Sequence, residues 1–441
     1  MLVTIIICAV TILVMVGAVL FKPYVNIKGH AVGVYWMVCL AGAILLIACG
    51  CISFSAVIEG VTANSSVNPL KILTLFLSMT LLSVYLGDAG FFDAVADKIF
   101  SVTRGSQLKL FLGLYLVVAV LTIFTSNDII VLTFTPAICI FAKKAKISPL
   151  PYLVGEFIGA NTWSMMLIVG NPTNIYLAQS AGITFNQYLS TMVVPTICGG
   201  LVSLLVLLFI FRKQLKTPLP DKKIPDIEHA EKLAPKVKTE KITMVMAITH
   251  LLTCIVMLSL SDLIGVEMWL VCFISALSLS LFDIIYDAIR YKTVRPVLRS
   301  LKKEPYELIP FVLSMFVIVL ALNNCGATSA LSNLLISNTN ADSVVLGFTS
   351  ALSANLLNNI PMSVLFEGIV SNANYGAVLG AVVGSNIGAF ITPVGALAGI
   401  MWNKILNAHG VKLPFRNFLF YGIVVAIPTL IATLVPLYFL V

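Results

Sequence analysis

Charged side chains are scarce in this sequence. Only 10% of its 441 residues are Asp, Glu, Lys or Arg, against roughly a quarter in an average soluble domain, so the composition excludes an ordinary soluble enzyme. Apolar residues make up 59% of the chain, far more than a disordered chain carries. The apolar runs are continuous and reach about 20 residues, as in membrane-spanning helices and unlike the alternating segments of a transmembrane β-barrel. The sequence therefore predicts an all-α polytopic protein of the cell (inner) membrane.

Motifs of several other protein classes are also absent. No loop carries a Cys-x-x-Cys pair, and the nine cysteines nearly all fall inside apolar runs, so no disulfide framework is expected. The P-loop, GxSxG and HExxH motifs are missing, which excludes an ATPase motor within the chain and predicts no cofactor and no metal. An ATPase that drives this protein would be a separate subunit. The net charge of +8 forms no cluster on a soluble face, so no nucleic-acid partner is expected.

The apolar stretches are of two kinds. Eight are uninterrupted and predict simple spans near 2–20, 31–52, 70–87, 189–211, 242–260, 267–288, 307–322 and 417–440. Four more are interrupted by Asn, Gly or Pro, and we interpret 108–141 and 343–370 as hairpins and 150–182 and 375–408 as discontinuous helices. An unpaired backbone group in hydrocarbon costs several kcal/mol, so such breaks persist only where protein or a water-filled cavity satisfies them. The four breaks are therefore the first places to look for a site.

The basic residues predict how the chain is oriented. If 108–141 enters and leaves on one side, 26 of the 27 Lys and Arg residues face a single compartment and only Lys71 lies opposite. The positive-inside rule assigns that compartment to the cytoplasm and places both termini outside. An ordinary pair of crossing helices at 108–141 gives the same sidedness, so charge leaves the depth of the hairpin open.

The two halves of the chain resemble one another in order. Met79–Ile99 matches Met315–Leu335, with Gly90 falling on Gly326. We expect a first membrane repeat over 1–212, a flexible cytoplasmic linker over 213–241 and a second repeat over 242–441. Each repeat has five transmembrane helices plus one re-entrant hairpin. Because five is odd, the second repeat is inverted relative to the first, and inverted repeats with broken helices are typical of secondary transporters.

The candidate binding residues are the polar side chains at the four breaks. Short polar residues and glycines there leave free N–H groups, which suit an anion or a polar oxygen species, and free carbonyls, which suit a small cation. Paired amides can bind substrate or merely satisfy broken backbone, and spacing alone leaves both open. The candidates are Ser126, Asn127, Asp128, Asn161, Asn171, Thr173, Asn174, Asn358, Asn359, Asn386, Thr392 and Gly395.

Asp128 is the most conspicuous of these residues because it is the only carboxylate at the four breaks. An Asp at the centre of a membrane helix costs about 2.5–3.5 kcal/mol on the insertion scale, so its presence needs a reason. We predict a coupling residue that carries a proton or a cation; the alternative is a structural cap of the hairpin helix. Two other carboxylates in apolar runs, Glu156 and Glu367, are expected to reach an interface by snorkelling.

At these residues the sequence resembles the ion transporter superfamily, and most closely its arsenical-pump membrane permeases and the related sodium/proton antiporter branch. The motifs are Ser126–Asp128 through Thr135-Pro136, Asn358–Pro361, and Gly384–Gly388 through Ile391–Ala398 to Trp402. Gly170–Asn174 is instead closer to the Gly-x-Pro-Pro-Asn of dicarboxylate and anion members. The resemblance implies a homodimer of scaffold and moving transport domains, as in an elevator, with alternating access driven by an ion gradient.

We therefore predict a secondary active transporter that exports arsenite, antimonite or a related small oxyanion in exchange for protons. Two alternatives stay open at this stage. One is a sodium/proton antiporter in which Asp128 and backbone carbonyls bind Na⁺, and the other is a sodium-coupled importer of carboxylates or other small anions. The absence of Arg and Lys from all four breaks weakens the carboxylate alternative.

Overall fold

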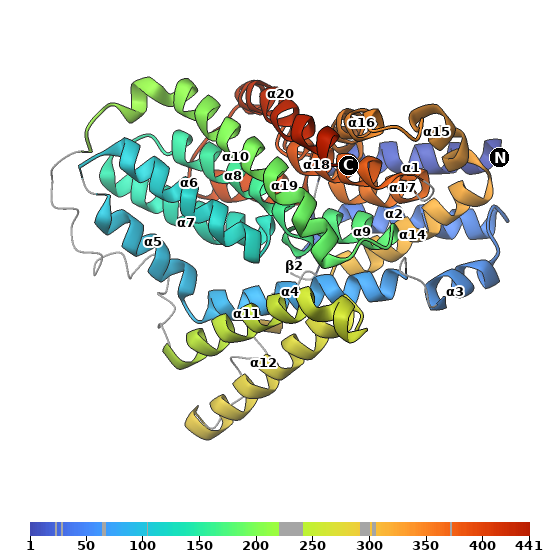
Figure 1. Cartoon of the computed structure of the whole chain (residues 1–441), viewed down its shortest axis with the longest axis horizontal. Helices are drawn as coiled ribbons and strands as arrows, with labels where there is room; N and C mark the ends of the chain where they lie inside the picture. Colours follow the sequence, from blue (N-terminus) through green and yellow to red (C-terminus); the bar gives the residue numbers. More distant parts are fainter. Residues whose placement is uncertain are drawn as a thin grey trace.

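The computed structural model describes residues 1–22, 24–27, 30–63, 68–103, 105–219, 241–291, 300–301, 306–370 and 373–441. Nearly all of this described chain is helical, and long helices lie side by side along the longest axis of the molecule (Figure 1). The predicted linker 213–241 is described only as far as residue 219 and at residue 241. Its central part, residues 220–240, lies outside the described residues.

The helices of the first half follow the predicted apolar segments with additional short elements between them. They are α1 (Leu2–Phe21), α2 (Val34–Ala48), α3 (Phe54–Thr62), α4 (Pro69–Asp88), α5 (Phe91–Val102), α6 (Gln107–Phe124), α7 (Asn127–Ala145), α8 (Leu150–Trp163), α9 (Pro172–Ser180) and α10 (Phe185–Leu215). Two short 3₁₀ turns, η1 (Ser164–Met166) and η2 (Ile168–Gly170), separate α8 from α9.

The second half contains the same succession of long and broken helices. Its elements are α11 (Lys241–Ile264), α12 (Met268–Tyr291), α14 (Leu308–Asn324), α15 (Ala327–Leu335), α16 (Ala341–Leu357), α17 (Asn359–Val370), α18 (Tyr375–Gly388), α19 (Leu397–Ala408) and α20 (Phe415–Leu440). Helix breaks therefore fall at residues 125–126, 164–171, 358 and 389–396, inside the four segments in which the sequence predicts them.

Six helices among the described residues are long and apolar enough to cross a membrane: α4, α6, α10, α11, α12 and α20. The pair α14 and α15 passes the same test together but bends by 78° between its members. The predicted span 31–52 is shorter than expected, because strand β2 (His30–Gly33) pairs antiparallel with β1 (Tyr24–Ile27) and α2 begins only at Val34. The chain is thus a multi-span membrane protein.

Two sharp bends occupy equivalent places in the halves. Gly90 joins α4 to α5 and Gly326 joins α14 to α15, and both glycines have a φ of +80°. A residue with a Cβ is disfavoured in this left-handed conformation, which explains glycine at both positions. The sequence match that aligns Gly90 with Gly326 therefore aligns two residues with the same backbone conformation.

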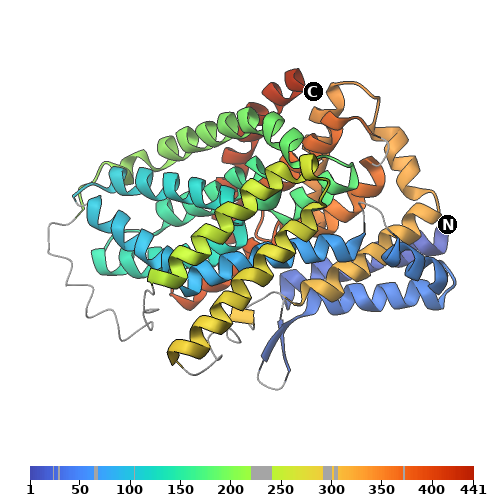
Figure 2. The ribbon, with the colours of Figure 1, turned by 60° about the horizontal axis from the view of Figure 1, so that its bottom comes forward.

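The two halves pack into one another rather than side by side. Helix α7 packs against α19 of the second half, and α17 packs against α9 of the first half. The outer helices show the same exchange, since α2 packs on α14 and α4 packs on α12. Figures 1 and 2 show the resulting bundle, with the N-terminus beside α15 at one end and the start of α6 and the end of α10 at the other.

Within the second half, helices α16 and α18 approach one another closely. Gly380, Gly384 and Gly388 form one stripe of α18, and a Cβ added at any of them would overlap the backbone of α16. Small residues at a four-residue spacing allow two membrane helices to pack at backbone contact. This close packing fixes the end of α18, where the break of the second discontinuous helix begins.

Candidate functional site

The first hairpin tip is the turn between α6 and α7. Ser126 is the N-cap of α7, and its hydroxyl accepts a hydrogen bond from the backbone N–H of Ile129 at 3.4 Å. Asn127 and Asp128 therefore lie in the first helical turn, where free N–H groups and the helix dipole favour a partial negative charge. The Asn127 amide nitrogen donates to Oδ1 of Asn161 at 3.0 Å. Its amide oxygen is buried and has no hydrogen-bond partner within the described chain.

The second hairpin tip, between α16 and α17, has a strained backbone. Asn358 has φ +76° and ψ 150°, a region that is nearly reserved for glycine and costs of order 1–3 kcal/mol. Its side-chain nitrogen donates to the carbonyl of Val394 at 3.0 Å, and the N–H of Asn359 donates to the carbonyl of Gly395 at 2.9 Å. The side-chain oxygen of Asn359 is buried without a partner in the described part of the structure. Each tip therefore presents one free amide oxygen.

The break in the first half is satisfied by its own asparagines. Asn171 is the N-cap of α9 and accepts hydrogen bonds from the N–H and the hydroxyl of Thr173, both at 3.2 Å. Asn174 donates from its amide nitrogen to the carbonyls of Ser164 at 2.9 Å and Leu167 at 3.2 Å. These two bonds give the carbonyls of the unwound segment a side-chain donor, in the case of Leu167 in addition to the N–H of Gly170.

Asn386 of α18 joins this break to the second half. Its side-chain oxygen accepts from the hydroxyl of Ser164 and the amide of Asn171, both at 2.9 Å. Its side-chain nitrogen donates to Oδ1 of Asn174 at 2.6 Å and to the carbonyl of Val382 at 2.8 Å. Asn386 is completely buried, and its bonds connect α18 to the first break.

One hydroxyl links the Asn386 cluster to the first tip. The Ser164 oxygen lies 2.9 Å from the side-chain oxygen of Asn386 and also 2.9 Å from the backbone carbonyl of Asn161, the residue that accepts from Asn127. A hydroxyl carries one proton and can fully satisfy only one of these two acceptors. Polar groups within hydrogen-bond distance of one another therefore lead from Asn127 through Asn161 and Ser164 to Asn386.

The second break is closed by a smaller set of bonds. Asn355 donates to the carbonyl of Gly388 at 2.9 Å and accepts from the hydroxyl of Thr392 at 2.8 Å. The N–H of Gly395 donates to the carbonyl of Thr392 at 3.0 Å. The predicted residues Asn358, Thr392 and Gly395 thus belong to one tip-and-break assembly, distinct from the Asn386 cluster.

Asp128 differs from every asparagine around it. It is half-buried, and it makes no hydrogen bond and no ion pair with any side chain or backbone group in the described residues. The capping alternative is not what the geometry shows, because Ser126 caps α7 and Asp128 is the second residue of the helix. A carboxylate that holds nothing in place is available to bind a proton or a cation.

A narrow apolar cavity lies between α4, α9, α14 and α17, beside the second hairpin tip and the first helix break. Ile360, the residue after Asn359, and Pro172, the residue after Asn171, both line it. The other lining side chains are apolar except for Ser363 and Tyr176, and the Tyr176 hydroxyl is buried without a partner in the described chain. No charged residue lines this cavity.

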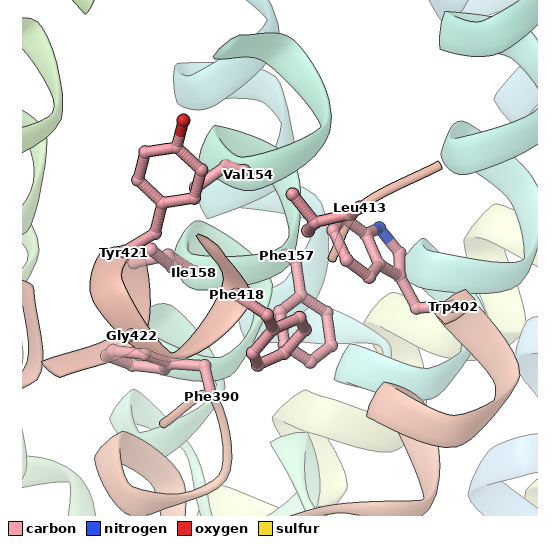
Figure 3. Close-up of a pocket in the computed structure, with 9 residues that line it drawn as sticks. All are labelled: Val154, Phe157, Ile158, Phe390, Trp402, Leu413, Phe418, Tyr421 and Gly422. Atoms are coloured by element: carbon pink, nitrogen blue, oxygen red, sulfur yellow. The ribbon is translucent and has the colours of Figure 1, made fainter. Parts of the chain in front are cut away.

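A second apolar pocket lies away from the tips, where aromatic side chains of α8, α19 and α20 converge (Figure 3). Trp402 stacks on Phe157 with ring centroids 4.9 Å apart, and Phe418 meets both rings edge-on. The polar edge of Trp402 is turned to a buried carboxylate. This pocket is aromatic packing around that carboxylate and does not involve the candidate binding residues.

The carboxylate is Glu156, and the snorkelling prediction for it is wrong. Glu156 is only 1% exposed and accepts hydrogen bonds from the hydroxyl of Thr135 at 3.0 and 3.2 Å and from Nε1 of Trp402 at 3.2 Å. The prediction failed because these two donors are contributed by α7 and α19, which approach α8 only through tertiary packing. Glu156 thereby ties the first hairpin to the second broken helix.

The structure thus divides the predicted residues into two groups. One group is hydrogen-bonded to other groups at the tips and breaks or within its own helix: Ser126, Asn161, Asn171, Thr173, Asn174, Asn358, Asn386, Thr392 and Gly395. Asn127, Asp128 and Asn359 retain oxygen atoms without a partner among the described residues. Sequence reasoning missed Ser164, Ser385 and Tyr176; the only available signal was that Ser385 precedes Asn386, and its hydroxyl indeed lies 3.0 Å from that of Thr173.

Known proteins with similar sequences are membrane pumps and transporters. The chain is 26% identical over 448 residues to an Escherichia coli arsenical pump membrane protein, covering 96% of this chain and 98% of the relative. It is also 26% identical over 380 residues to the arsenical pump membrane protein of Escherichia coli K12, covering 82% of this chain and 84% of that protein. An uncharacterised transporter of Synechocystis is 24% identical over 394 residues, with coverage of 82% and 84%.

A family model described as "Citrate transporter" matches residues 33–377. This match covers most of the chain, including both hairpin tips and the first broken helix. It agrees with the resemblance that the motifs at 126–136 and 358–361 predict. The chain therefore belongs to the citrate transporter (CitMHS) family of membrane transporters.

Proposed function

We propose that this protein is a secondary active transporter that exports a small neutral metalloid hydroxide, arsenite or antimonite first, in exchange for protons. The observation that carries the proposal is the chemistry beside the hairpin tips. The polar groups at the two tips are amides, hydroxyls and the single carboxylate Asp128, and the cavity that adjoins the second tip is apolar. Arsenous acid is uncharged near neutral pH, and its hydroxyl groups can donate hydrogen bonds. The amide oxygens of Asn127 and Asn359 can accept such bonds. The names of the Escherichia coli relatives support the same substrate.

The family description names citrate, which is a polyanion, and this makes a sodium-coupled carboxylate importer the second candidate. Recognition of carboxylates usually relies on Arg or Lys donors. The ion pair that the described residues form, between Lys71 and Glu267 at 2.6 Å, links α4 to the start of α12 and involves neither tip. Without a cation at the tips, only helix dipoles and coupled ions would offset the charge of citrate.

A sodium/proton antiporter is the third candidate, and the two free amide oxygens favour it. Amide and carboxylate oxygens are the ligands of small hard cations. In that reading Asp128 and the Asn127 oxygen bind Na⁺ directly and no metalloid is carried.

The proposed mechanism is alternating access between two inverted repeats, with the hairpins and broken helices moving against the outer helices. The exchanged packing of α7 with α19 and α17 with α9, together with the matching bends at Gly90 and Gly326, supports a two-fold relation between the halves. Inverted repeats of this kind carry their substrate near the midplane, at broken helices. Asp128 is the proposed coupling residue; its counterpart Asn359 cannot titrate, so the halves handle the coupling ion differently.

A flux panel in proteoliposomes tests the proposal. Purified protein is assayed with arsenite, Na⁺ and citrate under an imposed pH gradient, with protein-free vesicles as the control. We expect arsenite flux that depends on the pH gradient and is insensitive to Na⁺. Citrate uptake that requires Na⁺, or Na⁺-driven proton flux without arsenite flux, would replace the proposal by the second or third candidate.

A further inference from the structure

Three sulfur atoms meet inside the bundle, away from the hairpin tips. The thiol of Cys254 on α11 lies 3.9 Å from the thiol of Cys272 on α12 and 3.9 Å from the thioether of Met79 on α4. Both cysteines are completely buried, and Met79 is 3% exposed. The Cys254 thiol is therefore within 4 Å of two other sulfur atoms, each contributed by a different neighbouring helix.

We infer that Cys254, Cys272 and Met79 form a binding site for a soft monovalent cation of the Cu(I) class. Metal–sulfur bonds are about 2.3 Å long, and a metal bound at that length to two sulfurs 3.9 Å apart subtends an S–metal–S angle of about 116°. This angle is close to the 120° of a trigonal centre, so the two thiols need little rearrangement to bind. Thiolate and thioether ligands select Cu(I) over harder ions.

The ligand set argues against the commoner alternative, zinc. Structural zinc takes four ligands in tetrahedral geometry, mostly Cys and His. No cluster of three or more His, Cys, Asp or Glu side chains occurs in the part of the chain that the structure describes. Two thiols and a thioether leave Zn²⁺ short of ligands but complete a three-coordinate Cu(I) site.

The charge of the complex also fits a site in a membrane. Binding of Cu⁺ to one thiol, one thiolate and the thioether releases one proton and gives a neutral complex, with no electron transferred. A neutral complex avoids the cost of a charge in the bilayer interior. Cys272 is the fifth residue of α12, about 6 Å along the helix from Met268, at the end that is joined to α11.

A second sulfur pair in the chain provides a matched control. The Cys39 thiol of α2 lies 3.4 Å from the Met15 thioether of α1, and both residues are buried. This pair has the same helix–helix setting but only one thiol. It is therefore expected to pack as an ordinary soft apolar pair and to bind no ion tightly.

Titration of the full-length protein in detergent with the Cu(I)–bicinchoninate complex tests the inference. Cys49 and Cys51 are replaced by Ser throughout, because Cys49 is exposed and Cys51 half-buried and both would add background binding. We expect one Cu(I) per chain, an affinity at least 100-fold weaker in Cys254→Ser and Cys272→Ser, about tenfold weaker in Met79→Leu, and unchanged in Cys39→Ser. An unchanged affinity in Cys254→Ser, or an equal loss in Cys39→Ser, would overturn the site.

X-ray absorption of the Cu(I)-loaded protein with all three sulfurs intact keeps the inference testable even if a variant fails to fold. Three sulfur neighbours at about 2.3 Å are expected. A coordination shell with nitrogen or oxygen ligands would show that these cysteines serve only for packing. Neither measurement involves transport, so the result is independent of the proposed function.

Discussion

Replacement of Asn386 by alanine gives a direct measure of how strongly the second half holds the first broken helix. The side chain makes three hydrogen bonds to the first half, with Ser164, Asn171 and Asn174. Interhelical hydrogen bonds in membrane proteins contribute about 0.6 kcal/mol each on average. Asn386→Ala should therefore lower the free energy of unfolding by about 1.8 kcal/mol, with most of the loss at the Ser164–Asn171 break.

Asn161→Ala is the matched comparison. Asn161 is equally buried and occupies the equivalent position in the first half, but its side chain makes one hydrogen bond to another helix, with Asn127; its other bond goes to the Phe157 carbonyl of its own helix. By the same arithmetic its loss should be about 0.6 kcal/mol, a third of the first. Asn417→Ala at an exposed position of α20 should change stability by less than about 0.5 kcal/mol.

Equilibrium unfolding in mixed detergent micelles, followed by tryptophan fluorescence, measures the three values under one condition. The reasoning depends on the order of the variants more than on any single value. Equal destabilisation by Asn386→Ala and Asn161→Ala would refute the assignment of Asn386 as the residue that holds the break. It would show that the surrounding backbone supports the unwound segment without it.

Three further predictions address coupling and packing. Asp128→Asn should abolish the response of arsenite flux to a pH gradient while leaving arsenite counterflow in proteoliposomes; pH-driven flux at the wild-type rate would remove its coupling role. Gly384→Ala should destabilise the protein by about 1–3 kcal/mol in thermal unfolding, because the new Cβ overlaps Gly347 and Ser350 of α16. Gly17→Ala, with open space around it, should leave stability unchanged. Equal melting temperatures of the two variants would contradict this prediction. Glu156→Ala should lower the free energy of unfolding by about 1–3 kcal/mol more than Glu156→Gln, because only the glutamine side chain keeps an acceptor for the Thr135 and Trp402 donors. Denaturant unfolding of both variants measures the difference, and equal losses would contradict the prediction.

The helix breaks could be read from the sequence because local chemistry creates them. Asn, Gly and Pro inside an apolar run interrupt a helix wherever the run lies, and Asn127, Asn171 and Asn358 mark the interruptions in the structure. Short elements such as α3 and the β1–β2 hairpin were not predicted, because segments of four to nine residues carry little periodic signal.

The partners of the polar residues could not be read in the same way. Asn386 bonds to residues 212 to 222 positions away in the chain, and Glu156 bonds to Trp402 at a separation of 246. From the sequence alone, the paired amides could either bind substrate or support broken backbone. Only the tertiary arrangement divides them, by satisfying Asn386 completely and leaving the oxygen of Asn127 free.

The bonds from Asn386 to the first break also determine when that break can be completed during synthesis. Residue 386 follows Asn171 by 215 positions, and a ribosome adds about 5–20 residues per second, so the unwound segment waits roughly 10 to 40 s for its partner. During that interval the side chains of Ser164, Asn171 and Asn174 need water or another protein as hydrogen-bond partners. A chain truncated before α18 should therefore be recognised as unfinished and degraded, and co-expression of the missing segment as a separate polypeptide should rescue it.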